Sequence, residues 1–254
     1  MISIITTLYN YKKYLPALAI SVMEQTYEDW EWIIVDDAST DKPQDMLKVY
    51  GSHPQITVIT LPKNMGYSFA KNIGLQRAAG DYFVMIDADD YLTKDSLQVR
   101  YDELQRQPDK LWVHAEAQNL NLNGDLEDTY IKWNNSLRKK MIDTGIDLTK
   151  EYHHRLIHAQ TVMVRREFHK QLGLYDEHLR FSSDNEMWRR ALRFGFIPAY
   201  IPTPVSVYRV HDKRMSRSKF KRMHVAGVKE YIKRAVEIRH TKGININTTV
   251  LLKD

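Results

Sequence analysis

This chain contains a run of ten residues that sharply narrows the choice of folds, Asp81–Asp90 (DYFVMIDADD). Its apolar and aromatic stretch, residues 82–86, is typical of a strand buried on both faces, as in a parallel sheet. Three carboxylates follow at once, and like charges that close repel unless a cation or several donors lie between them. Because open α/β sheets bind ligands at the carboxyl ends of strands, Asp87 and Asp89 are candidate ligands of a hard divalent ion. An Asp-rich turn that caps the next helix would have the same composition.

The first 90 residues alternate between strand-like and helix-like stretches with short connections. We expect strands at residues 2–8, 30–35, 56–61 and 82–86 and helices from about residue 15, at 45–50 and at 67–79. Gly80 would end the third helix. This order predicts a parallel, doubly wound sheet.

The second half of the chain has a weaker pattern. Residues 118–150 are polar and turn-rich with Trp133 as the one large anchor, so we expect an excursion over the sheet there. Around it we expect helices at 93–107, 167–172 and 184–194, strands at 111–117, 158–165, 196–201 and 205–210, and a basic helix from Lys219 onward.

Composition and charge limit the functional classes. The 254 residues include no cysteine, which excludes disulfides and thiolate sites and fits a reducing cytoplasm. No run is long and apolar enough to cross a bilayer, and no signal sequence is recognisable. The net charge of +5 is uneven, since residues 213–242 hold eleven Lys or Arg against two Glu. That segment could contact an anionic acceptor or the inner membrane surface, or it could be a solvated helix face.

Other chemically useful side chains follow the first two predicted strands. Thr7 and Tyr9 come at the end of the first strand, where they could bond and stack on a base, and Asp36 ends the second. Lys71, on the third predicted helix, could neutralise a phosphate or pair with one of the Asp residues. Because the carboxyl ends of parallel strands lie side by side, we expect the groups at the strand ends to converge with Asp87. Turn residues and a helix cap would explain each of them separately.

Several of these stretches together resemble one protein family. The run Ile4–Asn10 (IITTLYN) is similar to the opening strand of the family 2 glycosyltransferases, which have the GT-A fold. The resemblance continues through residues 21–27, 33–41, 64–75, 80–90, 173–177 and 183–190. It covers residues 2–110 closely and 158–211 more loosely.

The fold that this resemblance implies is α/β of the GT-A type. It has a mostly parallel, Rossmann-like central sheet flanked by helices, followed here by an acceptor-side region and a basic helix. Residues 1–211 would form the catalytic domain, with 1–117 as the nucleotide-sugar-binding half and 118–211 as the acceptor and catalytic-base half. Residues 212–254 would be a basic helical extension.

The activity that it implies is inverting transfer of a sugar from a nucleoside diphosphate to a hydroxyl group, with Mn²⁺ or Mg²⁺. The acceptor would be a glycan, a cell-surface polymer or another anionic molecule. Uridine diphosphate is the favoured nucleotide, because a carboxylate accepts well from the imide N–H of uracil; thymine offers the same edge.

The resemblance also implies roles for individual residues. Thr7, Tyr9 and Asp36 resemble the base pocket, and Lys71 stands where the family has a basic residue. Asp87-Ala88-Asp89 is similar to the family's Asp-X-Asp motif, with Asp87 on the ribose or metal and Asp89 on the metal and diphosphate. Asp184 matches the catalytic base, and His211 matches a histidine that approaches the diphosphate or metal.

The chain departs from the family pattern at one position. Where the family often has Glu-Asp, this chain has Ser183-Asp184, so one acidic group is missing on the acceptor side.

Three alternative functions remain at the level of sequence. A sugar nucleotidyltransferase would need a glycine-rich loop after the first strand, and residues 7–11 contain no glycine. A donor-binding protein without activity and a sugar transferase directed to nucleic acid are the other two alternatives.

Overall fold

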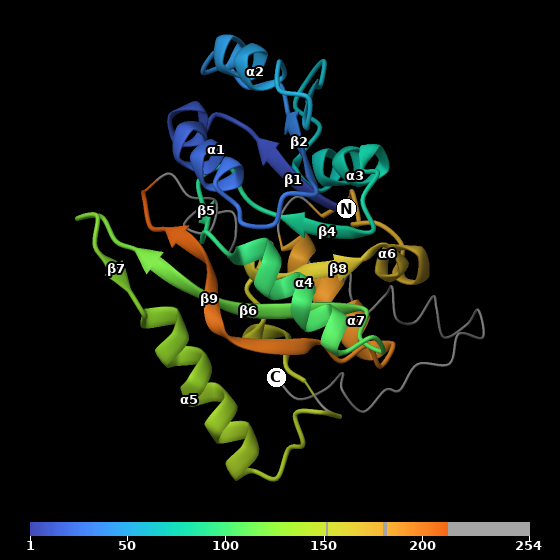
Figure 1. The fold of residues 1–254 in the computed structure, drawn as a ribbon. Helices are drawn as coiled ribbons and strands as arrows, with labels where there is room; N and C mark the ends of the chain where they lie inside the picture. Colours follow the sequence, from blue (N-terminus) through green and yellow to red (C-terminus); the bar gives the residue numbers. More distant parts are fainter. Residues whose placement is uncertain (151, 180–181, 213–254) are drawn as a thin grey trace.

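The computed structural model describes residues 1–150, 152–179 and 182–212 (Figure 1). One sheet runs through this part of the chain in the order β3-β2-β1-β4-β8-β6-β9-β5, with β7 paired to β6. Its strands are β1 (Ile2–Leu8), β2 (Trp30–Asp36), β3 (Ile56–Thr60), β4 (Tyr82–Met85), β5 (Tyr91–Leu92), β6 (Trp112–Leu120), β7 (Leu126–Glu127), β8 (Met163–Arg165) and β9 (Ala199–Arg209).

The N-terminal part of the sheet is parallel, as the sequence predicts. β1 lies between β2 and β4, and β2 pairs with β3, all in parallel register. β8 then pairs antiparallel with both β4 and β6, and β9 runs parallel to β6. The strands of the two predicted halves of the catalytic domain therefore belong to one continuous sheet.

Helices cover both faces of the sheet (Figure 1). Side chains alternate along each strand, so Ile4 packs into the core on one face and Ile5 into the core on the other. The first core includes residues of α1 (Leu15–Met23), α2 (Gln44–Tyr50) and α4 (Ser96–Arg106). The second includes residues of α3 (Tyr67–Arg77), α5 (Thr129–Asp143), α6 (Arg166–Leu172) and α7 (Ser183–Arg193). Three short 3-10 helices complete the fold: η1 (Lys12–Tyr14), η2 (His154–Leu156) and η3 (Ala159–Thr161).

The third helix ends earlier than the sequence predicts. α3 stops at Arg77 because Ala78 already has an extended backbone. Gly80 has a packing role beyond the helix end: a Cβ there would lie 2.6 Å from Ser3 Oγ and 2.8 Å from the Met1 carbonyl oxygen. Gly80 therefore permits close approach to the start of β1.

The excursion over the sheet that we expect at residues 118–150 contains more regular structure than its polar, turn-rich sequence indicates. Residues 129–143 form α5, a helix of 15 residues, and β6 extends to Leu120. The helix was not recognisable from apolar periodicity because two of its three buried residues are the polar Asn134 and Arg138.

Two strand predictions also need correction. Only Met163–Arg165 of the predicted strand 158–165 is a strand, since Ala159–Thr161 form η3. The predicted strands at 196–201 and 205–210 are one strand, β9, which continues through Pro202 and Pro204. The pairing of β6 with β9 shifts register near Pro204, and a bulge of this kind accommodates proline within a sheet.

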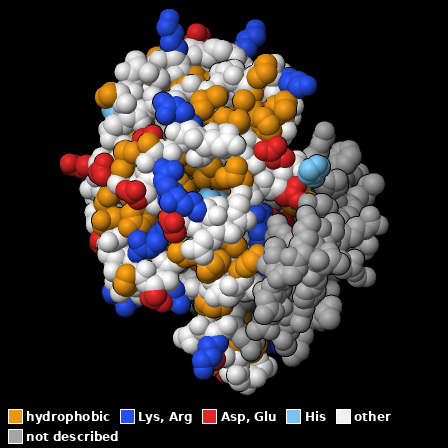
Figure 2. Space-filling view, turned by 90° about the vertical axis from the view of Figure 1, so that its right-hand side faces the viewer, with side chains coloured by type: hydrophobic (Ala, Val, Ile, Leu, Met, Phe, Trp, Pro, Cys, Tyr) orange, Lys and Arg blue, Asp and Glu red, His pale blue; other side chains and the backbone are white. Residues whose placement is uncertain are grey.

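The predicted basic helix, in residues 213–254, lies outside the described residues. Its contact with an anionic acceptor or membrane, and the cytoplasmic location, stay predictions. Among the described helices, none combines the length and apolar composition needed to cross a bilayer. On the face that Figure 2 shows, the coloured Lys and Arg side chains are scattered among acidic and hydrophobic ones.

Candidate active site

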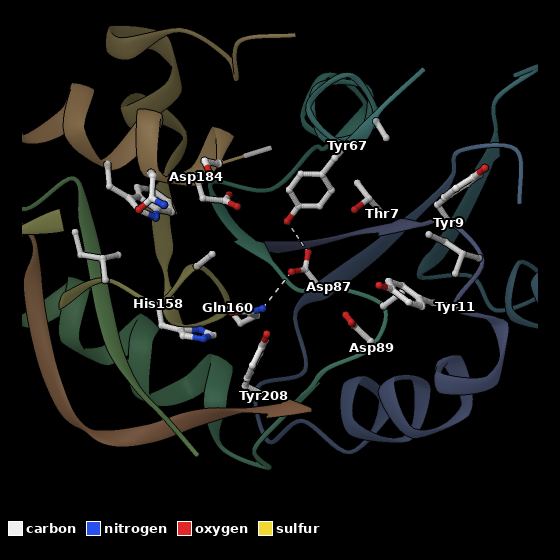
Figure 3. Close-up of a pocket in the computed structure, with 18 of the residues that line it drawn as sticks. Thr7, Tyr9, Tyr11, Tyr67, Asp87, Asp89, His158, Gln160, Asp184 and Tyr208 are labelled. Atoms are coloured by element: carbon white, nitrogen blue, oxygen red, sulfur yellow. Dashed lines mark hydrogen bonds between the residues drawn. The ribbon is translucent and has the colours of Figure 1, made fainter. Parts of the chain in front are cut away.

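A cavity of about 750 Å³ opens at the carboxyl ends of β1, β2 and β4. The cavity is large enough for a molecule of nucleotide-sugar size. Both predicted halves of the catalytic domain contribute to its wall. The lining residues include, from the first half, Thr7, Tyr9, Tyr11, Asp37, Tyr67, Asp87, Ala88 and Asp89 and, from the second, Tyr130, Trp133, Arg155, His158, Gln160, Asp184 and Tyr208 (Figure 3).

The loops after β1 and β2 are tied to each other. Asn10 and Ala38 have positive φ angles of 60° and 58°, which turn the chain sharply beyond each strand. The Asn10 backbone N–H donates to Ser39 Oγ at 3.0 Å, and the Thr40 backbone N–H donates to Asn10 Oδ1 at 2.7 Å. These bonds hold the two strand ends together at the cavity.

The two carboxylates after β2 have different surroundings. Asp36, which the sequence predicts for the base pocket, is completely buried, and its Oδ1 accepts from the Ser39 backbone N–H at 3.0 Å. Asp37 lines the cavity and accepts from the backbone N–H groups of Met65 and Gly66, at 2.6 and 2.9 Å. Burial raises the pKa of Asp37, and these two N–H donors partly oppose that effect. The structure therefore places Asp37 rather than Asp36 on the wall beside Thr7 and Tyr9.

The carboxylates that follow β4 form an acidic cluster. Asp87, Asp89 and Asp90 each offer an oxygen, and the three oxygens lie within 4.8 Å of one another. Tyr67 Oη donates to Asp87 Oδ1 at 2.6 Å, and Gln160 Nε2 donates to Asp87 Oδ2 at 3.1 Å (Figure 3).

Burial dominates the electrostatics of this cluster. It raises the pKa of Asp87 to about 6; the Lys71 ammonium opposes this shift, and Asp89 adds to it. Burial and the charges of Asp89 and Asp87 raise the pKa of Asp90 well above its usual value. Asp90 accepts from Gln160 Nε2 at 2.5 Å and from the Arg209 backbone N–H at 2.8 Å.

The acidic cluster fits a hard divalent cation. Its candidate ligands are carboxylate oxygens close enough to share one ion, and buried like charges are costly without a compensating cation. Asp87 and Asp89 line the cavity, as the sequence predicts for metal ligands. His211, the third predicted ligand, is buried, and its Nε2 lies 2.8 Å from Asp89 Oδ2. It is therefore placed in direct contact with the cluster.

Asp184 enters the cavity from the first turn of α7. It forms an ion pair with Lys71, whose side chain is only 2% exposed. The Lys71 ammonium also lies over the rings of Tyr67 and Tyr175, 4.0 and 4.7 Å from their centroids. The sequence suggested pairing of Lys71 with an Asp at a strand end, whereas its partner in the structure is Asp184 on α7. In Figure 3, Asp184 lies across the cavity from Tyr9, with Asp87 between them.

Sequence reasoning missed several residues of the site. Tyr67 and Gln160, which donate hydrogen bonds to Asp87, were not predicted. The carboxylates Asp37 and Asp90 were not assigned roles either. Tyr67 follows directly after Gly66, a recognisable turn glycine at the start of a helix, and this local signal could have placed it near the strand ends. Gln160 is 73 residues from Asp87 and carries no local signal.

This arrangement defines a class of protein. A Rossmann-like parallel sheet with Asp-X-Asp at the end of β4 and an acidic residue on a facing helix is the GT-A glycosyltransferase architecture. The chain belongs to glycosyl transferase family 2, whose model matches residues 3–173.

Known proteins with similar sequence agree with this membership. TuaG of Bacillus subtilis, whose name assigns it to teichuronic acid biosynthesis, is 30% identical over 87% of this chain and 83% of its own length. A chondroitin synthase of Escherichia coli is 28% identical over 72% of this chain, and the match spans 26% of that protein.

Solved structures share the fold. S. aureus TarS 1–349 in complex with UDP-GlcNAc superposes with a TM-score of 0.67 over 85% of this chain and 61% of that one, at 19% identity. The mannosyltransferase PcManGT of Pyrobaculum calidifontis, in complex with GDP-Man and Mn²⁺, gives 0.65 over 84% and 57% of the two chains, also at 19% identity. This chain thus spans about three fifths of these neighbours.

Proposed function

We propose that this protein transfers a sugar from a nucleoside diphosphate, with uridine diphosphate favoured, to a hydroxyl group of a glycan, inverting the anomeric carbon. The observation that carries the proposal is that Asp184 and the acidic cluster line the same cavity from different halves of the chain. Asp184 would be the base on the acceptor side of the cavity, and the acidic cluster would lie beside the diphosphate of the donor. A single in-line displacement between them inverts the reacting centre.

The donor would lie along the ends of β1, β2 and β4. Thr7, Tyr9 and the carboxylates after β2 would hold the base, with Tyr9 offering an aromatic face that is 45% exposed. The TarS complexes with UDP and UDP-GlcNAc support uridine, whereas PcManGT holds GDP-Man in the same fold. The base contact is therefore the part of the donor site that most needs testing.

Asp87 and Asp89 would hold Mn²⁺ or Mg²⁺. When bound, the ion neutralises charge on the departing diphosphate. Tyr67 and Gln160 donate to Asp87 and fix its orientation. His211 holds Asp89.

Asp184 would accept the proton of the acceptor hydroxyl as that oxygen attacks the sugar. Lys71 binds Asp184 Oδ1, and this ion pair fixes the carboxylate in the cavity wall.

The substitution Asp184→Asn tests the proposal. We expect turnover to fall by about 10²–10⁴-fold, because the amide cannot accept the proton, while uridine diphosphate binds with nearly unchanged affinity. Binding is measured by calorimetry and turnover by nucleotide release. Asp95→Asn is the matched control, since exposed Asp95 is the N-cap residue of α4, near a helix N-terminus as Asp184 is, but does not line the cavity. Unchanged turnover in a folded Asp184→Asn protein would refute the assignment of the base and would favour a donor-binding protein without this chemistry.

A further inference from the structure

The acceptor side of the cavity carries an aromatic wall. Trp133 lines the cavity and is 46% exposed, whereas the other four tryptophans of the chain are at most 6% exposed. Its ring lies 5.9 Å from that of Tyr130, and Tyr130 lies 4.6 Å from His158 in an edge-to-face arrangement. Tyr208 continues the wall 5.2 Å from His158.

This wall is separate from the region assigned to the base. In Figure 3, His158 and Tyr208 lie on the other side of Asp87 from Tyr9. A nucleotide stacked on Tyr9 with its diphosphate at the acidic cluster would leave the aromatic wall for another molecule. Exposed aromatic faces provide apolar contact at low cost in conformational entropy, and the apolar face of a sugar ring matches such a surface.

The helix that carries the wall is fixed to the sheet by polar contacts. Asn134 Nδ2 on α5 donates to Glu116 Oε2 of β6 at 2.8 Å, and Tyr200 Oη of β9 donates to Glu116 Oε1 at 2.6 Å. The Arg138 guanidinium lies 3.4 Å from the centre of the Tyr200 ring. These buried contacts set the direction in which Trp133, one residue before Asn134, projects.

A cation lies in the same part of the cavity. Arg155 is exposed, lines the cavity and belongs to η2, which contacts both α5 and α7. No carboxylate among the described residues forms an ion pair with its side chain. Burial, then the charges of Arg189 and His153, lower the pKa of the neighbouring His154 to about 3, so its imidazole is neutral at pH 7. The positive charge of this wall therefore resides on arginine.

We propose that Trp133, Tyr130 and Arg155 form the acceptor subsite, and that its ligand is an anionic glycan. A sugar ring of the glycan packs on Trp133, and a carboxylate or phosphate group of the glycan binds the Arg155 guanidinium, whose planar donors suit either anion. The inference rests on the proposed function, because it names the acceptor of that reaction.

Binding of defined oligosaccharides tests this subsite without requiring turnover. The probes are a hyaluronan tetrasaccharide for carboxylate, pentamannosyl phosphate for phosphate, and neutral N-acetylchitotetraose. We expect at least one acidic probe to bind about tenfold or more tightly than the neutral one, since a charge-assisted contact is worth that much or more. The emission of Trp133 should shift to shorter wavelength on binding, and the shift should be absent in Trp133→Phe.

Variants assign the contacts, with affinity measured by calorimetry. Trp133→Ala should lower the affinity for the acidic probe by about tenfold, and Trp133→Phe should retain most of the wild-type affinity. Arg155→Ala should bring the acidic probe to the affinity of the neutral one. Ile142→Ala on α5 and Arg106→Ala on α4 are exposed controls that do not line the cavity, and they should change nothing.

Uridine diphosphate affinity, measured on each variant, keeps this inference distinct from the proposed function. Failure of the nucleotide to bind wild-type protein would refute the donor assignment but not an Arg155-dependent preference for acidic glycan. Equal affinity for acidic and neutral probes, no binding of any probe, or acidic binding that survives both Trp133→Ala and Arg155→Ala would overturn the subsite.

Discussion

Asp87 shows how a single side chain in this site depends on its neighbours. Its two oxygens accept from Tyr67 and Gln160, which come from different parts of the chain, and burial raises its pKa to about 6. In metal sites, mutation of a group that orients a ligand typically costs about 10–100-fold in metal affinity or activity. Tyr67 and Gln160 are therefore targets for mutation in the same way as the carboxylates of the Asp-X-Asp motif.

Tyr67→Phe should weaken Mn²⁺ activation by about 10–100-fold, because the phenol that orients Asp87 is lost. The measurement is turnover as a function of Mn²⁺ concentration after treatment with EDTA, which should abolish turnover in both proteins. Tyr50→Phe, on α2 outside the cavity, is the control. Full activity in EDTA, or identical Mn²⁺ titrations for Tyr67→Phe and wild type, would contradict the assigned role.

The two carboxylates after β2 lead to a second prediction at the residue scale. Asp37 lines the cavity, whereas Asp36 is enclosed. Asp37→Asn should therefore lower the affinity for uridine diphosphate by about tenfold, because the imide N–H of uracil loses a charged hydrogen-bond acceptor. Asp36→Asn should mainly lower the free energy of unfolding. Calorimetry with uridine and guanosine diphosphates, together with denaturant unfolding, separates the two effects. The reverse result would restore Asp36 as the base contact.

At the scale of elements, α5 carries Tyr130 and Trp133 of the cavity wall. It packs on β6 through a buried polar face, and Glu116 at the centre of that contact is completely buried. Burial raises the pKa of Glu116, and hydrogen bonds from Tyr200 and Asn134 oppose the shift. Such networks specify one orientation when every group has a partner and are costly when one partner is removed.

Asn134→Ala should therefore destabilise the protein by about 1–3 kcal/mol, because a buried carboxylate oxygen loses its donor. Hydrogen exchange of the α5 amides should accelerate more than exchange in β1. Exposed Asn135 on the same helix is the matched control, since Asn135→Ala changes helix propensity equally without touching Glu116. Equal stability of the two variants would show that the polar contact does not fix α5.

At the scale of the whole molecule, one sheet joins the two parts of the chain that line the cavity. The antiparallel β8 connects the parallel N-terminal strands to β6 and β9, which carry Glu116 and Tyr200 and lead to His211. Burial also lowers the pKa values of the completely buried His114 and of the half-buried His154, His158 and His169, to about 3, 3, 4 and 4.

These histidines predict the pH dependence of stability. Because their folded-state pKa values lie below 6.5, the unfolded chain binds more protons, so their contribution is complete above pH 6.5 and is lost as the pH falls toward 4. Each group adds a slope approaching about 1.4 kcal/mol per pH unit within that range. The raised pKa values of Asp87 and Asp90 oppose this slope, because the folded state keeps protons there that the unfolded chain loses. The test is therefore a comparison: between pH 7 and 5, His114→Gln should lose less stability on acidification than the wild type, as measured by denaturant unfolding. An identical pH dependence of the two proteins would contradict the role of buried His114.

The parallel N-terminal strands, the acidic motif after β4 and the place of Asp184 at the start of a helix could all be predicted from the amino-acid sequence. These depend on local periodicity and on the rule that parallel strands end at one edge, so neighbouring residues carry the whole signal. Three features became apparent in the folded chain alone: Lys71 pairs with Asp184, 113 residues away, Asp37 rather than Asp36 lines the cavity, and a helix with a polar buried face carries Trp133. Contacts of this kind depend on which groups share a buried space, and no local pattern in the chain records that.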